Sequence, residues 1–430
     1  MNKKESYQSP KGTHDILPSE SPAWRFVENT FREICARHNF GEIRTPAFEH
    51  TEVFARTAGE SSDVLVTKQM YTFTAPDQDS YTLRPEGTAS VVRSYVQHNL
   101  VQYGPVSKLF YVCPVFRYEA PQSGRYRQHH QCGVEMLGAA SPESDAAVLA
   151  LAHEFLQALG IEAKLLLNSL GTAESRVAYV AAVRAHLEPK FDSLSEDSKK
   201  RFVLNPLRIF DSKDPRDKAA LVGAPHLLDS LRINDPESLE HFEALCARLR
   251  DLGIPYEIDH QLVRGFDYYT RTAFEFVSDK LGSQSTVLGG GRYDGLVQKL
   301  GGKPTAGIGF GSGIERLLLV REAMGLQLPD ADALQVFVVF EEGTDRALSP
   351  LLLQQLRSAG ISCDCDFAGR GSRPQMKEVF RQKAAFALIL EPSDGGIPTY
   401  SLKSMSDGSR QTVTLVEAIQ IVKNAGNDNG

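Results

Sequence analysis

The segment FRYEAPQSGRYRQHHQCGVE, from Phe116 to Glu135, decides how the rest of the chain is interpreted. It places Arg117 and Glu119 two residues apart on one expected strand, and Gln131 and Glu135 four residues apart on the next. Residues at these spacings project from the same face of a strand. Two antiparallel strands can therefore hold a cation, two carboxylates and an amide over one pocket. Because the planar fork of Arg matches phosphate oxygens, the segment suits a nucleotide held beside a small polar substrate.

The composition is that of a large globular protein. At 430 residues the chain is long enough for two or three domains, and 42% hydrophobic and 23% charged residues are ordinary values. No apolar run approaches the ~18 residues that span a membrane, and the N-terminal residues do not resemble a secretory signal. We therefore expect a cytoplasmic protein without a membrane partner. The net charge of −7 alone argues mildly against nucleic-acid binding, but it does not say where cationic surface lies.

The six cysteines are interpreted as reduced thiols, because they are scattered through a long chain. Cys363 and Cys365 form the only close pair, and they fit packing positions of a strand better than metal ligands. No Cys/His cluster has zinc spacing, so no metal site is predicted. The adjacent His129 and His130 would face opposite sides of a strand and could not easily share a metal.

The hydrophobic pattern changes along the chain. Up to about Gly160, helices mix with short β-rich runs, and the stretch between about Glu162 and Asp259 is mainly helical. Strand character then returns, followed by a glycine-rich turn and a strand-to-helix unit. The expected elements of this part are helices at 23–38, 88–97, 144–159, 177–186 and 236–252, strands between 258 and 276, the turn at 288–295, and the strand–helix unit at 306–321.

Beyond Gly325–Ala333, a short acidic segment with a proline, the pattern alternates between strand and helix. Such alternation predicts a small, mostly parallel α/β sheet. The last residues, Asn424–Gly430, are expected to form a frayed tail.

Two further segments offer polar groups to a ligand. In TLRPEGTASVVR (Thr82–Arg93), Thr88 is a good helix N-cap and Glu86 lies just outside the helix, where it could face an ammonium group. The alternative is a capped helix with surface charge. In QLVRGFDYYTRTAFEFV (Gln261–Val277), an Arg-Gly step precedes two adjacent tyrosines, one of which could face a pocket and the other the core. The alternative is a surface arginine beside an aromatic core pair.

Two glycine-rich segments remain ambiguous. GIGFGSGIERLLLV (Gly307–Val320) predicts a strand, an elbow and a helix with Arg316 near its first turn, a suitable seat for a triphosphate. Such turns are common, and this one matches neither the P-loop nor the dinucleotide fingerprint. LGGGRYDG (Leu288–Gly295) is a permissive loop in which Tyr293 could cover a pocket, or it is a plain turn.

Together these segments resemble the histidyl-tRNA synthetases, a family of class II aminoacyl-tRNA synthetases. KGTHDILP (Lys11–Pro18) is similar to the N-terminal signature of the family, and FGEIRTPAFEHTEVFARTAGE, which contains Pro46, to the dimer-forming first class II motif. Arg117 lies in the second motif and Arg316 in the third. LVRGFDYYTRTAFE resembles the histidine-specific signature, and NPLRIFDSKDP resembles part of the inserted domain of the family. Order and spacing agree from about Lys11 to Val422.

The resemblance implies an α+β fold. Its parts would be a catalytic domain at 1–324 with an antiparallel class II sheet flanked by helices, a helical insertion at about 170–255, a linker at 325–333, a C-terminal α/β anticodon-binding domain at 334–424, and a tail at 425–430. A homodimer is implied as well. The insertion would clamp RNA, because a site that reads the imidazole N–H has no need of an editing domain.

The activity implied is ATP-dependent formation of histidyl-adenylate, followed by transfer of the histidyl group to tRNA-His. By similarity Arg117 would hold the α-phosphate, Arg316 the γ-phosphate, and Arg264 the charge that develops at the α-phosphate. Glu119 would join the ATP site, and Mg²⁺ would accompany the phosphates. The residues implied for histidine are Glu86, Thr88 and Gln131 at its amino group and Glu135 and Tyr269 at its imidazole, with Tyr268 and Tyr293 as further histidine-binding residues.

Some positions depart from the pattern of the family. The loop after Glu119, which would approach the acceptor end of the tRNA with Gln122 and Arg125, has Ala120 and Ser123 where bacterial relatives carry cations. In the N-terminal signature, Lys11 and His14 replace arginines that are common in the family, whereas Arg117, Arg264 and Arg316 are present. Two alternatives remain: a non-catalytic, histidine-sensing regulatory subunit of ATP phosphoribosyltransferase, and a class II synthetase for another amino acid.

Overall fold

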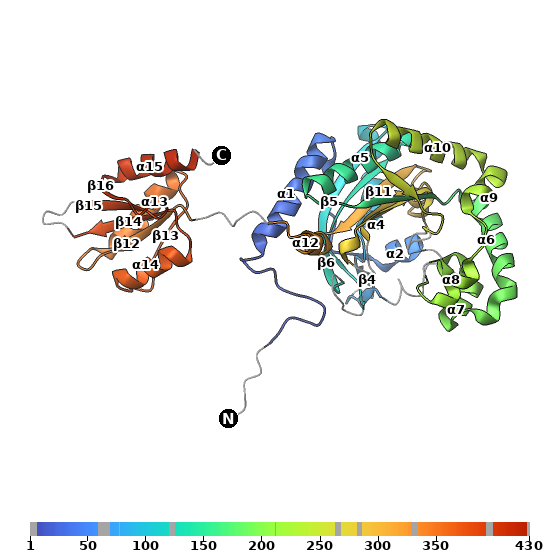
Figure 1. Cartoon of the computed structure of the whole chain (residues 1–430), viewed down its shortest axis with the longest axis horizontal. Helices are drawn as coiled ribbons and strands as arrows, with labels where there is room; N and C mark the ends of the chain where they lie inside the picture. Colours follow the sequence, from blue (N-terminus) through green and yellow to red (C-terminus); the bar gives the residue numbers. More distant parts are fainter. Residues whose placement is uncertain are drawn as a thin grey trace, which may run out of the picture. The chain divides into compact units, whose positions relative to one another are not determined.

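The computed structural model describes residues 7–58, 69–76, 78–119, 125–210, 212–262, 268–281, 286–327, 334–392 and 399–427. The chain divides into two compact units, Met1–Leu328 and Pro329–Gly430 (Figure 1). Arg264, Gln122, Ala120 and Ser123 lie outside the described residues, as does most of the expected linker. No helix among the described residues is long and apolar enough to cross a membrane.

The first unit is built around an eight-stranded sheet in the order β1-β5-β6-β11-β10-β9-β7-β8. All neighbours from β5 to β7 in this order are antiparallel, and only the edge strands β1 and β8 pair in parallel. The antiparallel central sheet is therefore confirmed. The strands are β1 (Gly41–Glu42), β5 (Ser107–Phe116), β6 (Gln128–Leu137), β7 (Lys164–Ser169), β8 (Tyr256–Ile258), β9 (Thr270–Val277), β10 (Thr286–Arg292) and β11 (Gly307–Gly313).

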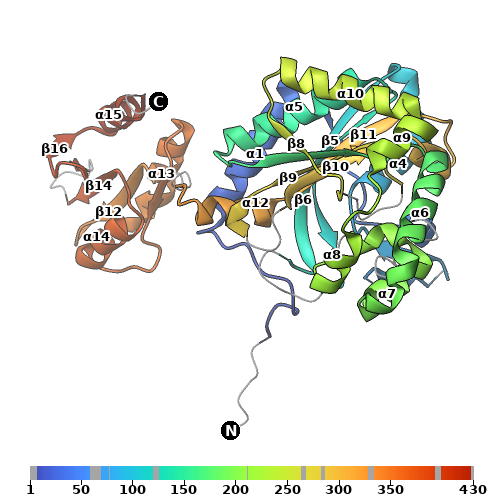
Figure 2. The same ribbon diagram turned by 45° about the vertical axis from the view of Figure 1, so that its right-hand side comes forward.

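Four helices cover one face of this sheet: α1 (Ser21–Arg37), α5 (Pro142–Ala158), α10 (Pro236–Asp251) and α12 (Ile314–Ala323). Both Figure 1 and Figure 2 show α5 beside α10, and these two helices are in contact. Phe31 of α1 lies with its ring centroid 4.9 Å from that of Phe155 and 5.8 Å from that of Phe110. Cys132 and Val134 of β6 are fully buried in the same core. The alternate residues of β6 therefore project from the opposite face, where the pocket lies.

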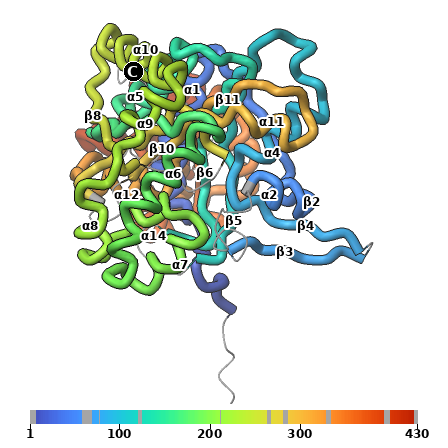
Figure 3. The backbone as a smooth tube through the Cα atoms, turned by 90° about the vertical axis from the view of Figure 1, so that its right-hand side faces the viewer, coloured from blue at the N-terminus to red at the C-terminus, as the bar shows by residue number. Residues whose placement is uncertain are grey.

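That opposite face is bordered by α4 (Thr88–Gln97), α2 (Thr51–Ala58), α11 (Leu296–Lys299) and a three-stranded sheet in the order β2-β4-β3. Its strands are β2 (Phe48–His50), β3 (Tyr71–Thr74) and β4 (Ser80–Leu83). Figure 3 shows β3 and β4 running side by side away from the rest of the unit. Because β4 leads directly into α4, this small sheet sets where the residues between them enter the pocket.

The segment between β7 and β8 is helical, as the sequence predicts. It comprises α6 (Ala173–Leu187), α7 (Glu196–Leu204), α8 (Pro215–Leu221), α9 (Leu227–Asn234) and α10, of which α10 packs on α5. Asp217 connects three parts of the segment, because its carboxylate accepts hydrogen bonds from the hydroxyls of Ser195, Ser198 and Ser212 at 2.7, 2.7 and 2.5 Å. Burial acts to raise the pKa of Asp217, but these bonds outweigh it and lower the pKa to about 2.

The second unit contains a five-stranded sheet in the order β13-β12-β14-β15-β16. The first three strands pair in parallel, as predicted, but β15 and β16 are antiparallel additions. The expected tail is also wrong in part, because α15 continues to Asn427. The elements are β12 (Val336–Phe340), α13 (Ser349–Ser358), β13 (Cys363–Cys365), α14 (Ser372–Arg381), β14 (Phe386–Glu391), β15 (Thr399–Ser404), β16 (Arg410–Val413) and α15 (Leu415–Asn427). Both cysteines of β13 are buried and unbridged.

The prediction of a turn at LGGGRYDG is wrong. Gly289, Gly290 and Gly291 lie inside β10, hydrogen-bonded between β9 and β11. A β-carbon on Gly290 would overlap the carbonyl oxygen of Gly309, and one on Gly291 would approach the carbonyl oxygen of Thr272 at 2.6 Å. The glycines therefore permit close backbone approach in a strand rather than a change of direction.

Candidate active site

A cavity of about 400 Å³ opens on the uncovered face of the large sheet. It brings together segments that are far apart in the sequence, at the ends of β4, β5, β9 and β10 and on β6 and β11. Most of the predicted site residues among the described part of the chain line it: Glu86, Thr88, Arg117, Glu119, Arg125, Gln131, Tyr268, Tyr269, Tyr293 and Arg316.

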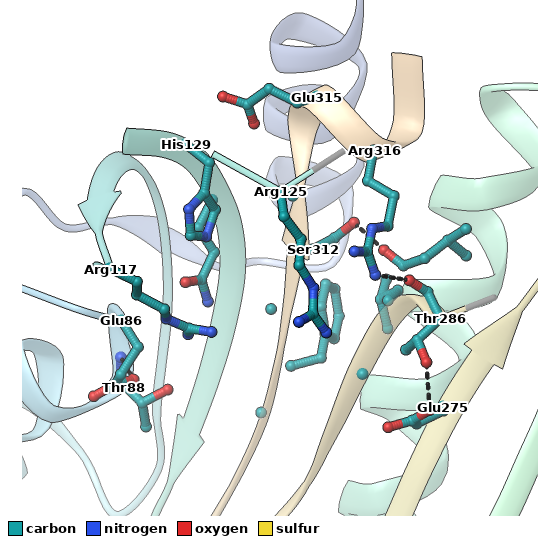
Figure 4. A pocket seen from close by; sticks show the side chains of 18 of the residues that line it. Glu86, Thr88, Arg117, Arg125, His129, Glu275, Thr286, Ser312, Glu315 and Arg316 are labelled. Carbon is teal, nitrogen blue, oxygen red and sulfur yellow. Dashed lines mark hydrogen bonds between the residues drawn. The ribbon is translucent and has the colours of Figure 1, made fainter. Parts of the chain in front are cut away.

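Three arginines give the cavity a cationic side. Figure 4 shows Arg117 and Arg316 on opposite sides of the view, with Arg125 between them. Arg117 lies one residue beyond the end of β5 and donates from Nε to the carbonyl oxygen of Pro85 at 2.7 Å. Arg316, in the first turn of α12, donates from Nη1 to the carbonyl oxygen of Thr286 at 2.7 Å. Each guanidinium is thus anchored to backbone, which holds it in place for an anionic ligand.

Burial lowers the pKa of Arg316, and Arg125 and Arg117 lower it further by repulsion. Arg125 forms a 3.4 Å ion pair with Glu119, which also lines the cavity. Glu119 and Glu275 offset the repulsion only in part, because the net effect still lowers the pKa of Arg316. The arrangement therefore favours a polyanion such as a triphosphate.

Glu86 and Thr88 stand at the start of α4, but the predicted N-cap role of Thr88 is wrong. Gly87 occupies the cap position, and the Glu86 carboxylate accepts the backbone N–H groups of Thr88 and Ala89 at 2.6 and 2.8 Å. Glu86 therefore accepts the free backbone N–H groups at the start of α4. The Thr88 hydroxyl instead donates a hydrogen bond to Glu135. Burial raises the pKa of Glu86, although these hydrogen bonds act against the rise.

Glu135 does not line the cavity but lies one layer behind its wall, with 1% of its surface exposed. Its carboxylate accepts hydrogen bonds from Thr88 Oγ1 at 2.7 Å, from the Tyr111 hydroxyl at 3.4 Å, and from the Tyr293 hydroxyl. Burial raises the pKa of Glu135 to about 8, and the hydroxyl donors limit that rise. The opposing Gly309 of β11 leaves the space that this carboxylate fills.

The two adjacent tyrosines do not divide between pocket and core as predicted. Tyr268 and Tyr269 both line the cavity, with ring centroids 4.7 Å apart. They precede β9, which begins at Thr270, so the alternation of a strand does not apply to them. Tyr293, from the end of β10, stands at right angles to Tyr268 at 5.9 Å, and the three rings form an aromatic wall.

Gln131 lines the cavity from β6 and donates from Nε2 to the Tyr111 hydroxyl at 3.0 Å. Tyr111 was missed by the sequence analysis, although it holds both Gln131 and Glu135. Its neighbour across the sheet is Gly133, and a β-carbon there would overlap the Tyr111 ring. The sequence does contain a signal for this contact. Gly133 lies between Gln131 and Glu135 on one face of β6, and a glycine at such a position leaves room for a large side chain from the neighbouring strand.

Other residues of the cavity were also missed or assigned no function. His129 and His130 face opposite ways, as predicted, and His129 lines the cavity. Burial and the positive charge of Arg117 lower the pKa of His129 to about 3, so it is neutral. His130 instead donates its backbone N–H to Glu315 Oε1 at 2.9 Å. Thr286 donates to Glu275 at 2.6 Å at the far side of the cavity (Figure 4).

The described residues contain no group of three or more His, Cys, Asp or Glu side chains that could hold a metal ion. Among the carboxylates that line the cavity, Glu119 pairs with Arg125 and Glu275 accepts a hydrogen bond from the hydroxyl of Thr286. Mg²⁺ is commonly held by one or two carboxylates together with substrate phosphates and water. The oxygen donors present fit a metal that arrives with a nucleotide.

Comparison with known proteins identifies close relatives. A family model described as histidyl-tRNA synthetase matches residues 12–317. A histidine–tRNA ligase of Levilactobacillus brevis is 46% identical over 427 residues, which cover 97% of this chain and 97% of that protein. The structure of apo histidyl-tRNA synthetase from S. aureus aligns with a TM-score of 0.81 at 38% identity, covering 97% of this chain and 100% of that one.

A more distant likeness concerns one of the alternatives. A structure described as an ATP phosphoribosyltransferase regulatory subunit/histidyl-tRNA synthetase from Bacillus halodurans aligns with a TM-score of 0.63 at 22% identity, covering 87% of this chain and 97% of that one. At this identity the likeness shows a shared fold and nothing more.

Proposed function

The chain belongs to the histidyl-tRNA synthetase family, and from this premise we infer that it activates L-histidine with ATP and transfers the histidyl group to the 3′ end of tRNA-His. The observation that carries the inference is a single cavity with a cationic side, formed by Arg117, Arg125 and Arg316, beside a wall of tyrosines backed by Glu135. The first side suits a triphosphate and the second a small polar ring.

In the first step, an oxygen of the histidine carboxylate attacks the α-phosphorus of ATP, the bond to the β-phosphate breaks, and pyrophosphate leaves. We propose that Arg117 holds the α-phosphate and Arg316 the γ-phosphate, with Glu119 completing the ATP site. Their backbone anchors at Pro85 and Thr286 fix both guanidinium groups before the ligand arrives. Catalysis would then come from positioning and charge stabilisation. Arg264, which lies outside the described residues, is proposed to stabilise charge at the α-phosphate.

Mg²⁺ would arrive with the ATP phosphates and neutralise part of their charge. We propose that Glu275, which lines the cavity and stands on the side of Arg316 in Figure 4, would share it.

Histidine is proposed to bind with its amino group toward Glu86, Thr88 and Gln131. Its imidazole would lie among Tyr268, Tyr269 and Tyr293. Glu135 lies behind the wall, so it would act on the ring through the Tyr293 and Thr88 hydroxyls that it holds. Buried acceptors of this kind reject analogues that lack the ring N–H by roughly 10⁴–10⁵, because the acceptors are then left unpaired.

In the second step, the terminal adenosine of the tRNA accepts the histidyl group and AMP leaves. Gln122 and Arg125 are proposed to approach the acceptor end. The helices α6 to α9 would clamp the RNA, and the second unit would bind the anticodon. We further propose that the enzyme works as a cytoplasmic homodimer built around the segment with Pro46.

The direct test is pyrophosphate exchange into ATP with each of the twenty amino acids and no tRNA. Exchange with histidine alone is the expected result. Histidine binding without exchange would overturn the proposal in favour of a regulatory subunit, and exchange with another amino acid in favour of a different synthetase. Arg216→Lys, on the exposed surface of α8, is a suitable control variant.

A further inference from the structure

Arg84 is a buried arginine that the proposed reaction leaves without a role. It follows β4 and precedes Pro85 and Glu86, and only 4% of its surface is exposed. It does not line the cavity. An arginine that is neither exposed nor in contact with the ligand space must be explained by what its side chain holds.

The guanidinium of Arg84 joins its own segment to two other parts of the chain. Its Nε donates to the carbonyl oxygen of Pro114 in β5 at 2.7 Å. Its Nη1 donates to the carbonyl oxygens of Thr45 and Pro46 at 2.8 and 3.1 Å, and lies 3.3 Å from the Thr45 hydroxyl. These acceptors are all neutral oxygens. Hydrogen bonds to these oxygens offset the cost of burying the cation and hold the guanidinium in one position.

The backbone around Arg84 is fixed as well. Its N–H donates to the carbonyl oxygen of Ala47 at 3.0 Å, and its carbonyl oxygen accepts the N–H of Phe116 at 2.9 Å. Arg84 is therefore bound to the strand end that carries Arg117 and to the segment before β2. Because both its main chain and its side chain are hydrogen-bonded to these segments, Arg84 cannot move without displacing them.

The next two residues, Pro85 and Glu86, connect Arg84 to the cavity. The carbonyl oxygen of Pro85 holds Arg117 Nε, and the carboxylate of Glu86 caps α4 from the cavity wall. A displacement of Arg84 would therefore move both the anchor of an ATP-binding arginine and the carboxylate proposed to bind the amino group of histidine.

We infer that Arg84 is a positioning residue for adenylate formation: it sets the relative places of Arg117 and Glu86, and so the distance between the two substrates. This inference rests on the proposed function. It also connects the cavity to Thr45 and Pro46, which belong to the segment expected at the dimer interface.

The test compares Arg84→Lys with Arg321→Lys. Arg321 is the matched control, since it is 6% exposed and also donates to backbone carbonyl oxygens, those of Leu159 and Gln327, but it does not line the cavity. Lysine keeps the charge but loses the fork that reaches several acceptors at once. Both variants should lose thermal stability, measured as Tm.

In pyrophosphate exchange only Arg84→Lys should lose kcat/KM, by roughly 10–100-fold, with a raised KM for histidine and a lowered kcat. Arg321→Lys should stay within about twofold of the wild type. If the two variants lose Tm alike and both keep the kinetic constants of the wild type, Arg84 is structural only and the inference is overturned. If the wild type itself shows no exchange with histidine, the proposed function has failed instead.

Should Arg84→Lys not fold, Thr45→Val carries the same test in milder form. It removes one acceptor and leaves the arginine in place. A rise of about twofold to fivefold in KM for histidine, with Tm close to that of the wild type, is expected. Unchanged kinetic constants in this variant would count against the inference.

Discussion

Thr88 Oγ1 donates a hydrogen bond of 2.7 Å to Glu135 Oε1, joining the first turn of α4 to the C-terminal part of β6. The two residues are 47 positions apart, and both side chains are buried. The bond places a carboxyl group where water cannot reach it, behind the wall of the cavity. Its ionisation therefore depends on the fold, and this dependence can be measured.

Glu135→Gln should change how stability varies with pH. Burial raises the pKa of Glu135 from 4.5 to about 8 in the folded protein. The folded protein therefore holds the proton of Glu135 more tightly than the unfolded chain does. The stability that the protonated group contributes is fully present below the pKa of the unfolded chain, 4.5, and is lost as the pH rises through the pKa of the folded protein, about 8. Glutamine cannot ionise, so the Tm deficit of Glu135→Gln should shrink between about pH 4.5 and about pH 8. A deficit that stays constant over this range would contradict the assignment.

Gly309→Ala should damage the histidine side of the cavity. The added β-carbon would overlap Glu135 Oε2 and the carbonyl oxygen of Val134, neither of which can withdraw easily. We expect a loss of about 1–3 kcal/mol of stability and a raised KM for histidine in pyrophosphate exchange. Gly295→Ala is the control, because nothing lies within 4 Å of its β-carbon position. Equal behaviour of the two variants would show that the space at Gly309 is not limiting.

Arg316→Lys should slow adenylate formation with little change in Tm. The variant keeps a positive charge but cannot both hold the Thr286 carbonyl and offer a flat donor face to phosphate. A fall in kcat of pyrophosphate exchange on the order of 10²–10³ is expected. Histidine binding, measured by calorimetry, should persist. An unchanged kcat would remove Arg316 from the proposed triphosphate site.

Asp217→Asn should loosen the helices α7 and α8 while leaving the sheet intact. The three serine hydroxyls that converge on the carboxylate would lose their charged acceptor. Because the pKa of Asp217 is lowered to about 2, the stability it contributes is present above the unfolded pKa and is lost as pH falls through the folded one. The variant should therefore differ from the wild type at neutral pH and converge with it in acid, as seen by hydrogen exchange of α7.

The same variant tests whether the inserted helices act on RNA. If they clamp the tRNA, Asp217→Asn should weaken histidyl transfer to tRNA far more than pyrophosphate exchange. Equal losses in the two assays would argue that the insertion supports the catalytic unit as a whole.

The sequence predicted those parts of the site that depend on the two-residue repeat of a strand or on a short motif. Gln131 and Glu135 were placed on one face of β6, and the structure has them there, opposite Cys132 and Val134. Arg117 and Arg316 were singled out by motif, and they meet in one cavity although 199 positions separate them by number, 316 − 117. Their meeting follows from strand order, which local periodicity does not contain.

The errors have a common physical origin, since local preference was overruled by long-range contact. Thr88 is a favourable N-cap by residue type, but the Glu86 carboxylate took that place and freed the Thr88 hydroxyl for Glu135. Tyr268 and Tyr269 precede their strand, so its alternation could not sort them. Tyr111 was overlooked because a tyrosine in a β-rich run looks like core until its partner Gly133 is known.

The glycines of β10 were read as a turn for the same reason, and their true place has a consequence for how this protein can change. Gly289 lines the cavity, so the wall of the cavity at this position is main chain. Glycine has no side chain, so no substitution at this position can remove atoms from the cavity wall. Substitution of Gly289 can therefore narrow the cavity but cannot enlarge it, and room for a larger substrate would have to come from other lining side chains, such as Tyr268, Tyr269 and Tyr293.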